Sequence, residues 1–132
     1  MAFKGIFKFK NKEYNLLDFD HEMTRGHDIA TGAPTRMPTP GIISITVEAG
    51  EDNKIAAWAF LDFANEEGEI ILYKRDSEAT LRKLVFKDAY IVKYHESFNS
   101  GNSTPCSISI SITPKEIEMS PEGINLIASW NA

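Results

Sequence analysis

The sequence predicts a small, mostly β protein with a single helix. Three features lead to this prediction: short segments that alternate apolar and polar residues, Gly and Pro residues between those segments, and only one stretch with apolar residues at helical spacing. The 132 residues, 42% of them hydrophobic, fit one domain with one core, residues 1–132. The formal net charge of −5 opposes a phosphate backbone, which makes nucleic acid a poor partner.

The first two strands are expected at 3–10 and 13–20. Phenylalanines alternate with lysines along the first segment, as in a half-buried strand. A polar turn at Asn11 and Lys12 separates the two segments, so that they form a hairpin.

Residues 27–41 are expected to form a long loop. Pro34, Pro38 and Pro40 stand close together there, which excludes a helix or a central strand. Loops of this length without structure of their own usually serve a function or a contact, although a mobile surface excursion is the alternative. A strand follows at 41–48, where β-branched residues alternate with other residues.

The one helix is expected at 52–63. Asp52 and Asn53 offer capping side chains, and the apolar residues that follow cover most of the helix circumference. Such a helix is normally packed on more than one side, against a sheet and either a loop or another subunit.

Two further strands are expected at 69–75 and 80–92. Leu84 and Phe86 indicate the inward side of the longer strand. Its alternation fails at 87–89, which predicts a turn or a bulge there.

The clearest strand alternates serine with isoleucine without exception. Its residues are Ser107, Ile108, Ser109, Ile110, Ser111 and Ile112, followed by Thr113. Apart from Cys106, no ionisable side chain stands between Glu96 and Lys115, so an exposed edge at this strand would pair with other chains. We therefore expect the strand to be central in its sheet or covered by a partner, and we place it at or near a subunit interface.

The C-terminal residues 120–132 are expected to form an extension that carries apolar side chains. Trp130 is the largest of them. It is expected to dock either on its own domain or on a neighbouring copy.

No residue pattern predicts a catalytic, cofactor or metal site. The three histidines are too scattered for a metal spacing, and Cys106 has no neighbouring base that would activate its thiol. Phosphate-binding glycine motifs and nucleophile-elbow motifs are absent. We therefore expect a protein that is not an enzyme and that needs no cofactor.

Two alternatives stay open beside self-assembly. The first is a monomeric barrel that binds a small apolar ligand in its interior. The second is a hydrolase on a small β scaffold, in which Asp18, Asp20 and His21 would have to converge in a pocket.

The sequence also gives an expected location. The N-terminal residues lack the apolar region of a secretory signal, and no stretch is long enough to span a bilayer. A single cysteine, Cys106, fits a reducing compartment. We expect a cytoplasmic chain without a membrane anchor, whose export would use a route without a cleaved signal.

An ordered set of structural motifs resembles the Hcp-like (haemolysin-coregulated, TssD-type) tube proteins of type VI secretion systems, in their divergent non-proteobacterial branch. The motifs are Phe3-Lys4-Gly5, Lys12-Glu13-Tyr14-Asn15-Leu16-Leu17, Ala30-Thr31-Gly32-Ala33-Pro34, Gly41-Ile42-Ile43, Tyr73-Lys74-Arg75-Asp76-Ser77, Asp88-Ala89-Tyr90 and the Ser-Ile strand that leads into Lys115-Glu116-Ile117. The likeness extends to about Met119. Ile29 and Ala33 depart from the family loop, which carries an Asp before Ala-Thr-Gly and a basic residue after it.

The resemblance implies a compact antiparallel β-barrel with one helix on its side, a homo-hexameric ring and stacked rings that form a hollow tube. It implies as partners a contractile sheath, a spike, baseplate proteins and small effector cargo in the lumen, and secretion by the type VI system. Within this arrangement, Ala30, Thr31, Gly32, Ala33 and Pro34 are expected to form a protruding loop that touches the adjacent ring.

Overall fold

The computed structural model describes residues 4–61, 65–74, 79–101, 106–121 and 123–127. Eight strands and one helix lie within these ranges. In chain order they are β1 (Gly5–Phe9), β2 (Lys12–Glu22), β3 (Ile42–Glu48), α1 (Lys54–Phe60), β4 (Glu66–Tyr73), β5 (Thr80–Phe98), β6 (Cys106–Thr113), β7 (Glu116–Ser120) and β8 (Ile124–Ile127).

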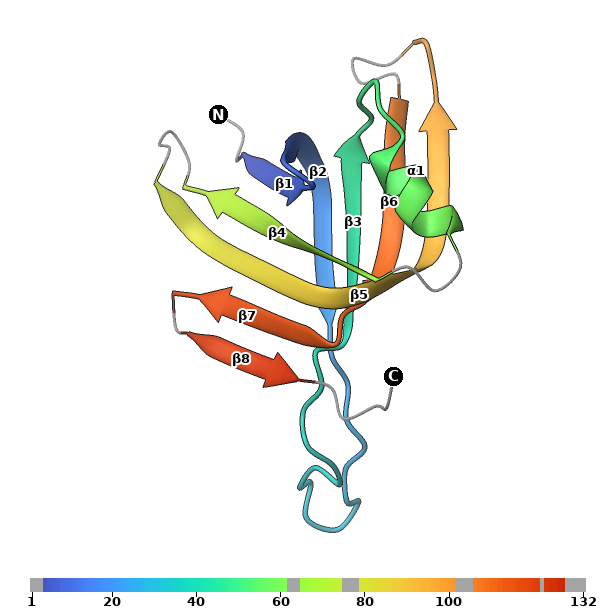
Figure 1. Cartoon of the computed structure of the whole chain (residues 1–132). Coiled ribbons are helices and arrows are strands. Elements are labelled where there is room, and N and C mark those ends of the chain that lie inside the picture. Colours follow the sequence, from blue (N-terminus) through green and yellow to red (C-terminus); the bar gives the residue numbers. More distant parts are fainter. Residues whose placement is uncertain (1–3, 62–64, 75–78, 102–105, 122, 128–132) are drawn as a thin grey trace.

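Six of the strands close a barrel in the order β4-β1-β2-β3-β6-β5, and pairing between β4 and β5 completes the circle. All neighbours are antiparallel, and β1 and β2 form the predicted hairpin. In Figure 1 the long strands β2, β3 and β6 stand upright, while β1, β4 and the first half of β5 cross in front of them. The prediction of a mostly β fold with an antiparallel barrel and one helix on its side is therefore confirmed.

Strand β5 belongs to both sides of the barrel. Its first half pairs with β4 and β7, and its second half pairs with β6. The strand changes direction near Asp88, which has a positive φ of 52°, at the place where the alternation fails in the sequence. Sequence reasoning ended the strand near Val92, but the structure continues it to Phe98 because β6 supplies a partner along that whole length.

Aromatic rings fill the space between the two sides of the barrel. Phe7, Phe9, Trp58 and Phe86 are all buried, and the Trp58 ring stacks 5.0 Å from that of Phe9 and 6.1 Å from that of Phe86. Ile43, Ile45 and Val47 of β3 and the isoleucines of β6 complete the same core cluster. The interior that an apolar ligand would need is occupied by the protein's own side chains.

Helix α1 is shorter than the predicted 52–63. It begins at Lys54, because Asp52 and the residues before it form the connection from β3, and it ends at Phe60, because Leu61 has an extended backbone. Residues 62–64 lie outside the described ranges. Ile55 and Trp58 are buried in the core, whereas Phe60 at the end of the helix is 73% exposed. Within this chain, the core therefore covers one side of the helix only.

Part of residues 120–132, which the sequence analysis treats as an extension, forms regular structure. Ser120 is the last residue of β7, and after a turn at Gly123, where φ is 68°, the chain returns as β8 and pairs with β7. Alternating residues drive this hairpin, since Ile117 is fully buried and Leu126, its partner across the ladder, packs against the core. Trp130 lies outside the described residues.

Candidate assembly surfaces

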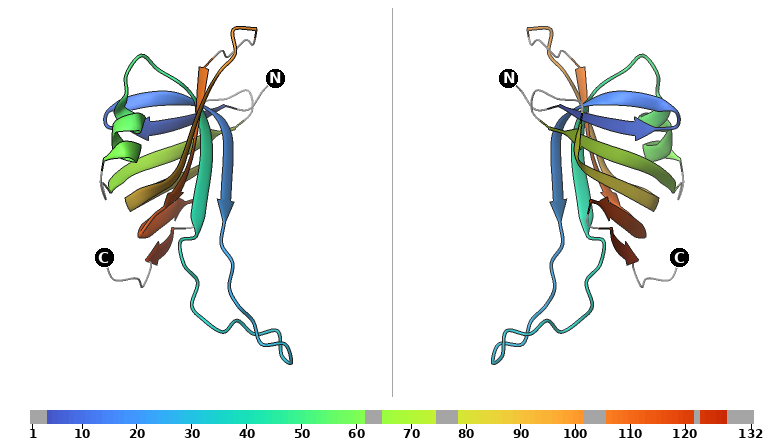
Figure 2. Two further views of the ribbon diagram at one scale, coloured as in Figure 1. Left: turned by 90° about the vertical axis from the view of Figure 1, so that its right-hand side faces the viewer. Right: turned by 90° about the vertical axis from the view of Figure 1, so that its left-hand side faces the viewer.

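A long loop, residues 23–41, projects from one end of the barrel and is called the projecting loop below. Figures 1 and 2 show it extending well beyond the strands that carry it, β2 and β3. Its side chains from Met23 to Met37 are exposed, and Ile29 is 97% exposed. An isolated bridge between His27 and Pro34 holds its two arms together.

The tip of the projecting loop is built around Asp28. The carboxylate of Asp28 accepts a hydrogen bond of 2.7 Å from the backbone N–H of Ala30, and its carbonyl accepts one of 2.7 Å from the N–H of Gly32. Thr31 adds a further bond, because its hydroxyl oxygen accepts the N–H of Ala33 at 3.2 Å. Ala30, Thr31, Gly32, Ala33 and Pro34 thus lie together at the tip, and their contact with an adjacent ring stays a prediction.

The loop rejoins the barrel at a tight passage. Gly41 has a φ of 79°, and a Cβ at this position would collide with the carbonyl oxygen of Glu22. On the same side, a ring nitrogen of His21 lies 2.7 Å from the carbonyl oxygen of Pro40. The base of the loop is therefore fixed to the ends of β2 and β3, whereas among the described residues no hydrogen bond joins its tip to the barrel.

Strand β6 lies in the middle of its sheet, between β3 and β5. Ile108, Ile110 and Ile112 point into the core, and the serines point outward. Central placement was one of the two outcomes expected for this uncharged strand. The prediction that residues 107–112 also lie at or near a subunit interface stays a prediction, and only the serine side of the strand is available for such a contact.

The serines form part of an outward polar surface, called the hydroxyl face below. The hydroxyls pair across the strands: Ser44 with Ser111 at 3.1 Å, and Thr46 with Ser109 at 2.9 Å. A shallow depression of about 210 Å³ lies over them, and it is flanked by the side chains of Asp18, Asp20 and Lys93. The hydroxyls of the hydroxyl face thus hydrogen-bond to one another, and the charged side chains lie on either side of them.

The three residues of the hydrolase alternative do not converge. Asp18 and Asp20 share the hydroxyl face, while His21 alternates to the other side of β2 and contacts Pro40. Among the described residues no group of three or more His, Cys, Asp or Glu could hold a metal ion. In the same part of the chain, no helix is long and apolar enough to cross a membrane.

A cluster of partly buried polar side chains connects the start of α1 to β2. The carboxylate of Asp52 accepts hydrogen bonds from the Tyr14 hydroxyl at 2.7 Å and from the Lys54 backbone N–H at 2.9 Å, and it pairs with Lys12 at 2.6 Å. Burial opposes ionisation of Asp52, but these donors outweigh it and hold its pKa well below the ordinary range. Burial and the bond to Asp52 raise the pKa of Tyr14. Sequence reasoning assigned Asp52 a capping role only and missed its partners on β2.

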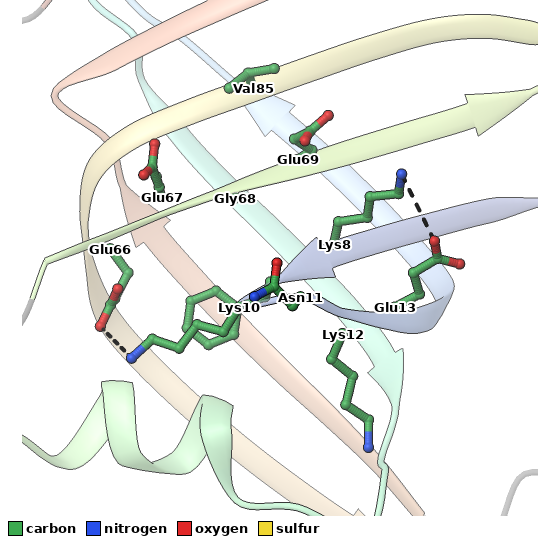
Figure 3. Close-up of a pocket in the computed structure, with 11 residues that line it drawn as sticks. Lys8, Lys10, Asn11, Lys12, Glu13, Glu66, Glu67, Gly68, Glu69 and Val85 are labelled. Carbon is green, nitrogen blue, oxygen red and sulfur yellow. Dashed lines mark ion pairs between the residues drawn. The ribbon is translucent and has the colours of Figure 1, made fainter.

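One depression on the surface is charged rather than apolar. It has a volume of about 610 Å³ and lies at the turn between β1 and β2, next to the start of β4 (Figure 3). Lysines and glutamates line it, and two pairs are matched there: Lys10 with Glu66 at 3.0 Å and Lys8 with Glu13 at 3.8 Å. A site of this kind does not suit the small apolar ligand of the first alternative.

Two of the places where apolar side chains are exposed lie at opposite ends of β5. A groove of about 410 Å³ is lined by Leu16, Leu17, Leu72 and Leu81, among others, where β1, β2, β4 and the start of β5 meet. Phe98, 70% exposed, lies at the far end of β5. In Figure 1 the start of β5 and the end of β4 lie on the left, and α1 and the end of β5 lie on the right.

Comparison with known proteins identifies the fold. The sequence matches the family described as Hemolysin coregulated protein Hcp (TssD) over residues 1–131. Among solved structures, Hcp1 from Flavobacterium johnsoniae shares 29% identity with a TM-score of 0.83, covering 94% of this chain and 98% of that one. No curated protein matches the chain.

More distant structures have the same fold. An Hcp protein shares 11% identity with a TM-score of 0.74, covering 98% of this chain and 100% of that one. The secreted protein Hcp3 from Pseudomonas aeruginosa shares 12% identity with a TM-score of 0.64, covering 99% of this chain and 100% of that one. With the family match over almost every residue, the resemblance inferred from the motifs is confirmed: the chain belongs to the Hcp (TssD) family, the structural, non-enzymatic tube proteins of type VI secretion systems, which form hexameric rings and are secreted.

Proposed function

We propose that this chain is a single-domain subunit of the inner tube of a type VI secretion system, and that its rings stack through the projecting loop. The family match over residues 1–131 supports the formation of a ring, and the position of the loop supports the stacking contact. The loop lies at one end of the barrel, its base is fixed, and its tip is exposed on all sides. A loop in this position can reach and contact a second ring stacked on the first.

The loop tip has the chemistry of a docking element rather than of a mobile tail. Asp28 and Thr31 accept hydrogen bonds from the backbone N–H groups of Ala30, Gly32 and Ala33, and these local bonds shape the turn. The exposed side chains of Ile29 and Met37 are apolar, so they gain by being covered. The family pattern has an Asp directly before Ala-Thr-Gly, a position that Ile29 occupies in this chain. Asp28 supplies a carboxylate one position earlier.

Deleting residues 31–38 tests the stacking proposal. Rings should form with the mass of the parent ring, while tubes seen by electron microscopy should disappear. A second variant replaces 31–38 with a Gly-Ser linker of the same length, so that chain length is kept while the tip chemistry is lost, and it should lose its tubes as well. Full-length tubes in both variants would overturn the stacking role of the loop.

The partners of the tube follow from the same proposal. We assign to the assembled tube a contractile sheath around it, a spike and baseplate proteins at its end, and small effector proteins in its lumen. The chain would stay in the cytoplasm before firing, which agrees with a single free cysteine, Cys106, and would then be exported as part of the tube. Co-purification of the tube with sheath and spike proteins, and its appearance in the culture medium only when the sheath can contract, would test these assignments.

A further inference from the structure

The last two strands extend one side of the barrel beyond its closure. Strands β7 and β8 continue from the first half of β5, in the order β2-β1-β4-β5-β7-β8, and this side is called the extended sheet below. In Figure 1, β8 lies at the end from which the projecting loop extends, while β1 and the start of β2 lie at the opposite end. Both views in Figure 2 show the same arrangement.

Strand β8 has an open edge with little protection. In the part of the chain that the structure describes, β8 pairs with β7 alone. Open edges are normally protected by charged side chains or proline, but β8 is protected only by its shortness, and no side chain in 123–132 is charged. Ile124 is 43% exposed and Ile127 is 59% exposed. An uncharged, apolar edge of this kind is suited to pairing with another strand.

The opposite end of the extended sheet also leaves strand backbone without a second neighbour. Within the described ranges, residues 12–15 of β2 pair with β1 alone, and the pairing of β2 with β3 begins after them. Lys12 and Glu13 are charged, but each forms an ion pair within the chain. The charges at this end are therefore balanced and do not oppose the approach of an uncharged strand.

We propose that β8 of one copy pairs with residues 12–15 of a second copy, which belongs to the adjacent ring. The inference rests on the proposed stacking of rings and names a second contact in it, besides the projecting loop. Each strand of the extended sheet is antiparallel to the next, so β2 and β8, at its two ends, run in opposite directions. The two strands would therefore pair in antiparallel fashion between copies that stand the same way up.

This contact can repeat along the tube. Each copy offers β8 at one end and the start of β2 at the other, so the contact is head to tail. A head-to-tail contact along one axis produces an open stack of rings rather than a closed pair of rings. Because the projecting loop reaches beyond β8 (Figure 1), a copy that meets β8 would also lie beside the loop tip.

The register of the extended sheet identifies the side chains that would meet. One row across its outward face consists of Glu13, Lys8, Glu69, Val85, Glu118 and Asn125. Glu13 and Asn125 stand at the two ends of this row, and both are exposed. If the sheet continues from one copy into the next, Asn125 comes level with Glu13 of the next copy, at the spacing of neighbouring strands.

Disulfide formation in the full-length chain tests this contact. Cys106→Ser removes the single cysteine, and Glu13→Cys/Asn125→Cys then places one thiol at each end of the row. Oxidised tubes of this variant should give a ladder of covalent dimers, trimers and longer multimers on denaturing gels, because facing residues of paired strands lie within the reach of a disulfide. The matched control is Glu13→Cys/Glu118→Cys in the same background. It should give no ladder, because Glu118 lies one strand further from the edge.

Two further variants locate the contact between rings. With residues 31–38 deleted as well, the cysteine variant should form rings without tubes and should give no ladder. Ile127→Lys, which places a charge at the open edge, should keep the mass of the ring in light scattering and lose the tubes seen by electron microscopy.

The outcomes separate this contact from the proposed function. Wild-type rings that never form tubes would overturn the stacking itself. Wild-type tubes would overturn the β8 contact alone if the cysteine variant gave no ladder, if the Glu118 control gave an equal one, or if Ile127→Lys formed tubes of wild-type length. A ladder from unstacked rings would overturn the placement of the contact between rings.

Discussion

The projecting loop and strand β6 were both identified from the sequence as contact surfaces, yet they are held in place by different forces. The loop tip depends on local hydrogen bonds at Asp28 and Thr31, and in the described part of the chain none of its hydrogen bonds reaches the barrel. Strand β6 is bonded on both edges and buries its isoleucines completely. Substitutions at the loop tip should therefore have little effect on the stability of the fold. The isoleucine side of β6, in contrast, is buried in the core and cannot form a contact with another subunit.

Ile110→Asp should produce the largest effect. Ile110 is 2% exposed in the core, so the substitution buries an unpaired carboxylate and should destabilise the chain by more than about 4 kcal/mol. Urea unfolding followed by circular dichroism measures this loss. Ser109→Asp, on the outward side of the same strand, is the matched control and should remain folded; equal losses in the two variants would contradict the assignment of the two sides.

Asp52→Asn should weaken the barrel at the start of α1 by about 1.5–3 kcal/mol at pH 7, because Lys12 and Tyr14 lose a charged partner. Since folding lowers the pKa of Asp52, its contribution is complete above the ordinary Asp pKa of about 3.9 and is lost as pH falls below that value. The stability difference between wild type and Asp52→Asn should therefore shrink below about pH 4. A difference that stays constant from pH 7 to pH 3 would show that the carboxylate charge is not what stabilises the cluster.

Gly41→Ala and Gly32→Ala separate the base of the loop from its tip. Both glycines have a positive φ, 79° and 76°, but only the Cβ at Gly41 meets backbone, while that at Gly32 meets nothing within 4 Å. We expect a loss of about 2 kcal/mol or more at Gly41 and of about 1 kcal/mol or less at Gly32. Thermal unfolding of the two variants gives the comparison, and equal losses would mean that the base is not a tight passage.

Asp28→Ala should have the smallest effect on stability, within about 0.5 kcal/mol, because the bonds it removes are local and exposed. The same substitution should reduce stacking, since the turn that presents Ala30 and Thr31 loses its acceptor. Urea unfolding and electron microscopy of rings and tubes measure the two effects. Unchanged tubes would show that the shape of the tip does not matter for stacking.

The sequence predicted the parts of the fold that alternation determines. Ile43 and Ile45 of β3, Leu84 and Phe86 of β5 and the three isoleucines of β6 all lie on the sides that their spacing indicated. The failure of alternation near Asp88 marked the place where β5 changes direction. Alternation reports burial on one side of a strand, so it is reliable where a strand has one buried face.

The rest depends on which strands become neighbours, which no local pattern reports. The hairpin of β7 and β8 was missed because its residues other than Ile117 are exposed or half-buried, so that its alternation is weak. The partners of Asp52 were missed because Tyr14 and Lys12 stand far from it in the sequence. Strand order alone shows that Asp18 and Asp20 on β2 lie on the other side of the hydroxyl face from Lys93 on β5.

The continuity of β5 has a consequence for how the domain comes apart. A strand of 19 residues that is bonded to β4 and β7 at its start and to β6 at its end cannot leave one side of the barrel without disturbing the other. Sub-global opening of half the barrel is therefore disfavoured, and hydrogen exchange in both halves of β5 should proceed at rates set by complete unfolding. The subunit should therefore move as a rigid body when force is applied to it.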